Sequence, residues 1–99
     1  MIARKGIDNI LAASHFVGVD GSLNLAEYRV RCVVTNISGK EMCVRDNGDV
    51  VRGDDNCVAS IIPASVMKRW AVGTYFLSFE LWRGEEKVMS NEVEQVDLI

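Results

Sequence analysis

The sequence predicts an all-β domain, and three observations lead to that prediction. Turn-forming pairs recur at short intervals along the 99-residue chain. The segments between them alternate apolar and polar residues. Proline occurs once, at Pro63, and no Gly/Ser-rich linker or repeat interrupts the pattern. Regular turns joined by segments with a period of two are typical of a β-sandwich or a small barrel, and we expect residues 1–99 to form one domain.

The composition argues against several classes of protein. Hydrophobic residues make up 48% of the chain and charged residues 25%, as in ordinary globular domains. The net charge is −3 with basic residues scattered among acids, whereas a nucleic-acid binder presents a basic face to phosphates. No apolar run is long enough for a bilayer, and no secretory signal is visible. We expect no nucleic-acid partner, no membrane contact and synthesis in the cytoplasm.

The N-terminal segment permits two interpretations. Ile7, Ile10 and Leu11 would share one face of a short helix. The segment runs on through Val19 to a turn signal at Asp20-Gly21, however, and that arrangement favours a first strand.

Residues 28–34 are the clearest strand of the first half of the chain. Arg29 and Arg31 point to one face, so that face is expected to meet water. The inward residues are Tyr28, Val30, Cys32 and Val34.

The stretch from Arg45 to Asp55 combines a turn signal with several acids. Asn47-Gly48 predicts a tight hairpin, because both residues accept positive φ. Short strands at 50–52 and 57–62 would follow it. Oxygen ligands of the kind calcium prefers are also present: Asp46, Asn47, Asp49, Asp54 and Asp55. Their spacing does not fit an EF-hand loop, so the hairpin is favoured and a weak surface calcium site stays open.

Residues 63–70 lack alternation, and Pro63 at a first helical position predicts one short helical turn. Gly73 then opens the strongest strand of the chain. Trp70 is expected to cover the end of the core, and the Tyr75 hydroxyl to reach a backbone group. The inward residues of this strand are Tyr75, Leu77, Phe79 and Leu81. A closing strand over residues 87–98 is expected to break near Ser90-Asn91.

No catalytic constellation is recognisable. His15 is the only histidine, and it falls in a segment that reads as an edge strand. Together with Cys32, Cys43 and Cys57 it lacks the close ligand spacing of structural zinc sites. We therefore predict no catalytic residue, no metal ligand, no cofactor and no enzymatic activity.

Two aromatic residues suggest a contact surface. Phe76 and Trp82 alternate with the inward residues of the strand at 75–81, so they fall on its opposite face. Exposed aromatics on a sheet face are typical of protein contacts. We predict Phe76 and Trp82 as partner-binding residues.

The order of these signals also supports a family resemblance. The residues concerned are Asp20-Gly21, Leu23, Leu25, residues 28–34, Ile61-Ile62-Pro63 and Gly73-Thr74-Tyr75. In this order the chain resembles small immunoglobulin-like β-sandwich modules of phage and prophage structural proteins. Among these are the tail-baseplate modules similar to the N-terminal domain of upper baseplate proteins.

The resemblance implies an antiparallel immunoglobulin-like β-sandwich of about seven strands, with one short helical turn near residues 63–70. It also implies a non-enzymatic virion structural or assembly module of the tail, baseplate or capsid. Such a module would contact other virion structural proteins, or itself as a homo-oligomer. It would reside in the virion after synthesis in the host cytoplasm.

The alternative is a β-sandwich that binds carbohydrate or calcium. Trp82 would stack on a sugar face, and the loop from Asp46 to Asp55 would hold an ion. The predicted core is the same in both cases: Tyr28, Val30, Cys32, Val34, Ile61, Trp70, Tyr75, Leu77, Phe79 and Leu81.

Overall fold

The computed structural model describes residues 1–18 and 23–99, and most of these residues lie in strands. The strands are β1 (Ile2–Ala3), β2 (Ile10–His15), β3 (Arg29–Asn36), β4 (Glu41–Arg45), β5 (Val51–Arg52), β6 (Cys57–Ile62), β7 (Gly73–Arg83) and β8 (Glu86–Leu98). The helical pieces are α1 (Ala64–Met67) and three 3₁₀ turns, η1 (Leu25–Glu27), η2 (Asn47–Asp49) and η3 (Asp54–Asn56). The all-β prediction is confirmed.

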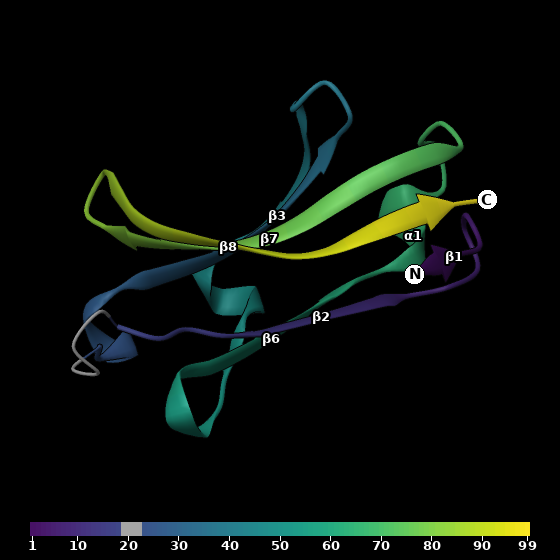
Figure 1. Cartoon of the computed structure of the whole chain (residues 1–99). Helices are drawn as coiled ribbons and strands as arrows, with labels where there is room; N and C mark the ends of the chain where they lie inside the picture. Colours follow the sequence, from purple (N-terminus) through teal and green to yellow (C-terminus); the bar gives the residue numbers. More distant parts are fainter. Residues whose placement is uncertain (19–22) are drawn as a thin grey trace.

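The strands form two sheets that lie as two layers (Figure 1). The five-stranded sheet has the order β1-β8-β7-β3-β4, and the three-stranded sheet has the order β2-β6-β5. Every pairing is antiparallel except that of β1, which runs parallel to β8. The predicted antiparallel arrangement therefore holds for all strands but the first, and neither β1 nor β4 was expected from the sequence.

The core lies between the two layers. The side chains predicted to point inward from β3 and β7 are buried there, and Tyr28 and Trp70 pack against its margin. The three-stranded sheet contributes residues from alternate positions of β2 and β6: Ile10, Ala12, Val58 and Ile62. Met67 of α1 closes one end of the core.

The placement of Ile61 in the core is wrong. Its side chain is 53% exposed, and the buried isoleucine is its neighbour Ile62. The inward positions of β6 are Val58, Ser60 and Ile62, so the strand turns a serine toward the core. The hydroxyl of Ser60 donates to the carbonyl of Asp49 at 2.9 Å, which satisfies this buried polar group. Because a polar residue, Ser60, occupies an inward position of β6, the alternation of polar and apolar residues does not show which isoleucine is buried.

The strand interpretation of the N-terminal segment is confirmed by β2, which ends at His15. The expected continuation to Val19 and the turn at Asp20-Gly21 extend outside the described residues.

The predicted hairpin at Asn47-Gly48 is wrong. Residues 47–49 instead form η2, which carries the chain from β4 in one sheet to β5 in the other. The side chain of Asn47 explains this, because its Oδ1 accepts from the backbone N–H of Val30 at 3.0 Å and from the guanidinium of Arg52. These long-range contacts outweigh the local preference for a tight turn. Hairpins do form at Gly39 and Gly84, where φ is +82° and +60°.

The predicted break near Ser90-Asn91 is also wrong. Strand β8 runs unbroken beside β7, with two shifts of register. The shifts fall where Val88 and Val93 are the extra residues on β8. A bulge absorbs an extra residue by local twisting, so the strand continues through it.

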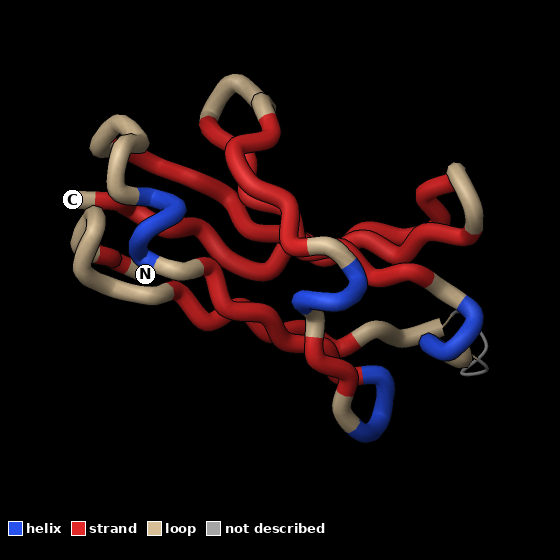
Figure 2. Tube along the Cα trace, turned by 180° about the vertical axis from the view of Figure 1, so that it is seen from behind, coloured by secondary structure: helices blue, strands red, loops and turns tan. Residues whose placement is uncertain are grey.

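The corner before β7 matches its prediction. α1 lies within residues 63–70, at the end of the molecule that holds both termini (Figure 2). Gly73 has φ +150°, and the Tyr75 hydroxyl donates to the carbonyl of Ala71 at 2.7 Å. The Trp70 ring lies 5.1 Å from the Tyr75 ring, between centroids. These contacts fix the direction in which the chain enters the central strand.

Candidate functional site

The predicted contact residues Phe76 and Trp82 both lie on β7. They project from the face of the five-stranded sheet that points away from the other layer, as expected from their alternation with the core residues. Both are half-buried.

Trp82 is held by side chains of its own sheet. Its Nε1 donates to Glu80 Oε1 at 2.9 Å, and Glu80 is only 8% exposed. The guanidinium carbons of Arg31 and Arg29 lie 5.3 and 5.9 Å from the ring centroid. Glu80 also pairs with Arg31 at 3.5 Å and with Lys87 at 3.6 Å. The indole therefore belongs to a closed polar network, and this limits what it can offer to a partner.

Phe76 borders an open hollow of about 360 Å³. Most of the lining groups are polar, and they come from β3, β7, β8 and the β3–β4 hairpin. They are Thr35, Asn36, Ile37, Gly39, Ser78, Ser90 and Glu92. This hollow combines an aromatic ring with hydroxyl, amide and carboxylate groups.

The outer face of the three-stranded sheet is different in character, because it is apolar. Leu11 on β2 lies opposite Ile61 on β6, and Ala13 lies opposite Ala59, which in turn pairs with Val51 on β5. The exposed fractions of Leu11, Val51 and Ile61 are 61%, 69% and 53%. We call these five residues (Leu11, Ala13, Val51, Ala59 and Ile61) the apolar face.

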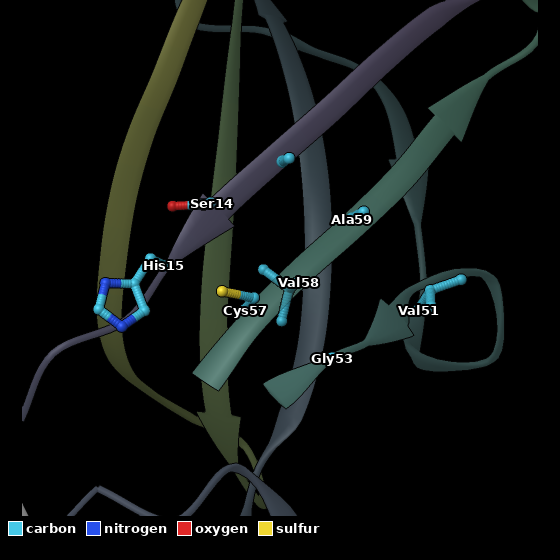
Figure 3. Close-up of a pocket in the computed structure, with 8 residues that line it drawn as sticks. Ser14, His15, Val51, Gly53, Cys57, Val58 and Ala59 are labelled. Atoms are coloured by element: carbon cyan, nitrogen blue, oxygen red, sulfur yellow. The ribbon is translucent and has the colours of Figure 1, made fainter. Parts of the chain in front are cut away.

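Two hollows interrupt the apolar face, on either side of Val51. The first has a volume of about 500 Å³ and an apolar lining that includes Ala13, Val51 and Ala59 (Figure 3). The second has a volume of about 280 Å³ and lies between Leu11, Ile61 and the side chains of Arg45 and Asp49. The face is therefore contoured and can receive projecting side chains.

Alternation alone did not reveal the apolar face. Strands β2 (ILAASH) and β6 (CVASII) carry apolar residues at both odd and even positions. Such runs are typical of strands covered on both faces. Two strands that are apolar on both faces would have indicated the apolar face, but only together with the knowledge that their sheet is covered on one side.

The cysteines and the histidine do not assemble into one site. Cys32 lies in the core and Cys43 is partly buried against it. His15 and Cys57 lie opposite each other on the outer side of the three-stranded sheet (Figure 3). Burial raises the pKa of Cys32 to about 12. Burial also raises the pKa of Cys43, and Arg45 partly offsets this effect. Within residues 1–18 and 23–99, no three His, Cys, Asp or Glu side chains converge as metal ligands.

The acidic loop is occupied by internal contacts. Asp46 accepts from the N–H of Asn47 and pairs with Arg29 at 3.6 Å, while Asp49 pairs with Arg45 at 3.7 Å. Asp54 and Asp55 lie apart from them in η3, between β5 and β6. Asp46 and Asp49 thus pair with different arginines, and Asp54 and Asp55 belong to another turn, which argues against the calcium alternative.

No protein-family model matches the chain, and no curated protein matches its sequence. In the part of the chain that the structure describes, no helix is long and apolar enough to cross a membrane.

Proposed function

We propose that the chain is a non-enzymatic structural module of a phage or prophage virion and that it acts through protein–protein contacts. The observation that supports a contact role is the apolar face. Leu11, Val51 and Ile61 each keep more than half of their side-chain surface in water. Burying a large aliphatic side chain contributes roughly 1.5 to 3 kcal/mol, so a partner that covers all three gains substantial affinity.

The proposal includes an immunoglobulin-like topology. In that fold, strands B, E and D form one sheet, and strands C, F and G form the other, with C′ added at the edge. The order β2-β6-β5, and the order β8-β7-β3-β4 within the five-stranded sheet, fit this arrangement when β2 is strand B and β7 is strand F. Strand β1 adds a parallel edge strand beyond β8. Tyr75 supports the match, since a tyrosine near the start of strand F characteristically bonds a backbone group a few residues upstream.

The virion assignment rests on the family resemblance of the turn and strand signals. The resemblance implies a docking or assembly role in the particle, without catalysis. A sheet face that is apolar and hollowed fits such a permanent contact, because obligate interfaces are more apolar than transient ones.

Cross-linking from defined positions tests the proposal. A photoreactive residue is placed at position 51 or 61 of the intact protein, and the particles that contain it are purified and irradiated. The matched controls are positions 40 and 69, where Lys40 and Arg69 are exposed elsewhere on the surface. We expect one defined adduct from positions 51 and 61 and none from the controls. Absence of the protein from purified particles, or adducts that do not depend on position, would contradict the proposal.

A carbohydrate is a second candidate ligand, because the Phe76 hollow combines an aromatic ring with Glu92 and several hydroxyl groups. Titration with a panel of glycans, followed by NMR, tests it. Shifts at Phe76, Ser78 and Glu92 that disappear in Phe76→Ala would support a sugar site. Unchanged spectra across the panel would exclude those glycans as ligands.

A further inference from the structure

The edge strand β2 differs from the other edges of the two sheets. It is six residues long, and it contains no charged residue, no proline and no shift of register against β6. By contrast, β1 and β5 have two residues each. Strand β4 carries Glu41 and Arg45 and pairs with β3 across a register shift. Short length, charge and bulges protect an edge from pairing with another chain, and β2 has none of these.

The hydrogen-bond pattern identifies which backbone groups of β2 face outward. The N–H of Phe16 donates to the carbonyl of Asn56 at 3.1 Å, just beyond the end of the strand. Antiparallel bonding alternates, so Ile10, Ala12 and Ser14 bond to β6, while Leu11 and Ala13 direct their backbone groups away from it. Cys57, which lies opposite His15, supports this assignment. Its carbonyl accepts from the N–H of Gly53 at 2.8 Å, so it faces β5 and not β2.

No other described strand pairs with β2 on its outer side. At one end, Asn91 Nδ2 donates to the carbonyl of His15 at 3.2 Å. The outward N–H and C=O groups of Leu11 and Ala13 are the middle of the edge, and they form a template on which an extended segment can pair.

We propose that β2 pairs antiparallel with β2 of a second copy of this chain. With the two-fold axis at Ala12, Leu11 of each copy lies opposite Ala13 of the other. The N–H of each of these residues donates to the carbonyl of its opposite residue. The pairing joins two three-stranded sheets into one of six strands.

A second copy is the partner that fits this edge. Each copy has a net charge of −3, and β2 is a segment through which two copies meet without bringing like charges together. Ala13 is small, so its side chain leaves room on the outer face for Leu11 of the other copy opposite it. The contact uses the same strand on both copies, so it closes as a dimer and leaves no free β2 edge for a third copy.

The dimer goes beyond the proposed function, because it does not depend on an external partner. It also places Leu11 of both copies beside the axis, so that the two apolar faces become one continuous surface.

Solution mass and amide exchange test the pairing. For the natural sequence, we expect a dimer by light scattering after size exclusion. Exchange at Leu11 and Ala13 should slow by at least tenfold as the protein is concentrated from monomer to dimer. The amides of Ala12 and Ser14, which bond within the monomer, should change little. A monomer at every concentration, or a dimer in which Leu11 and Ala13 exchange as fast as in the monomer, would overturn the proposal.

Two variants separate this proposal from the contact role of the apolar face. Ala13→Pro removes an outward N–H that β6 does not use, at an edge position where proline is tolerated. We expect it to be a folded monomer, whereas Val51→Asp should remain a dimer and lose the cross-linked partner. A folded Ala13→Pro that is still a dimer would overturn the pairing. If Ala13→Pro does not fold, the exchange measurement on the natural sequence decides.

Discussion

Tyr75 joins the loop after α1 to the centre of the five-stranded sheet. Its ring is buried, and its hydroxyl bonds the carbonyl of Ala71 at 2.7 Å. Tyr75→Phe leaves that carbonyl without its donor, so we expect the free energy of unfolding to fall by about 1 to 2 kcal/mol in urea denaturation. Tyr28→Phe is the matched control, because within residues 1–18 and 23–99 its hydroxyl accepts only from the exposed Arg83. If both substitutions lower the free energy of unfolding by the same amount, the hydrogen bond from Tyr75 to Ala71 does not contribute more to stability than an exposed one.

Cys32 makes stability depend on pH at the alkaline end. Burial raises its pKa from 9.0 to about 12, so the folded state keeps the neutral thiol where the unfolded chain ionises. The resulting stability is fully present below pH 9 and is lost as pH rises toward 12. Cys32→Ala lacks this contribution. We therefore expect the difference in unfolding free energy between the natural protein and Cys32→Ala to narrow with rising pH. If the difference in unfolding free energy stays constant with pH, the pKa of Cys32 is not raised in the folded state.

Strand β6 offers a comparison between two adjacent isoleucines. Ile62 is fully buried, whereas Ile61 lies on the apolar face. Ile62→Ala leaves a cavity, and we expect a loss of roughly 2 to 5 kcal/mol in unfolding free energy. Ile61→Ala should change it by less than about 0.5 kcal/mol in the isolated chain. Chemical denaturation of both variants checks the alternation of β6, and the reverse order of effects would mean that the strand is turned over.

The hairpins and the η2 crossover use glycine differently. Gly84 has φ +60° in the β7–β8 turn, while Gly48 in η2 does not have positive φ. Among the residues that the structure describes, no atom lies within 4 Å of a Cβ added at either glycine, so the backbone conformation decides the outcome. Gly84→Ala should lower the unfolding free energy by about 1 kcal/mol. Gly48→Ala should be neutral or slightly stabilising, as thermal melts of the two variants will show.

The elements that the sequence predicted well are those whose two faces differ in polarity. In β3 and β7, the inward residues predicted from alternation are buried, although Val33, on the same side of β3 as Arg29 and Arg31, is buried as well. Strand β6 has Ser60 inside and Ile61 outside, so the same reasoning assigned its isoleucine wrongly. The turn at Asn47 was misjudged because its side chain bonds Val30, which is distant in sequence. Contacts of that kind are set by the tertiary structure and leave no local signal.

For the molecule as a whole, the sequence located one candidate surface and missed another. Phe76 and Trp82 project from the face on which alternation placed them, but the side chains of Arg31 and Glu80 hold the indole. The apolar face was missed because its residues come from three strands whose order in the sheet is not readable from the chain. Only the pairing of β2, β6 and β5 brings Leu11, Val51 and Ile61 together.

The contact role of the apolar face is tested most directly by hydroxyl-radical footprinting of the protein in its native assembly and as an isolated chain. We expect oxidation of Leu11, Val51 and Ile61 to fall sharply in the assembly. Val72 and Val88 are exposed aliphatic residues outside the apolar face, and they should react equally in both states. If Leu11, Val51 and Ile61 react as readily in the assembly as in the isolated chain, the apolar face is not the contact surface.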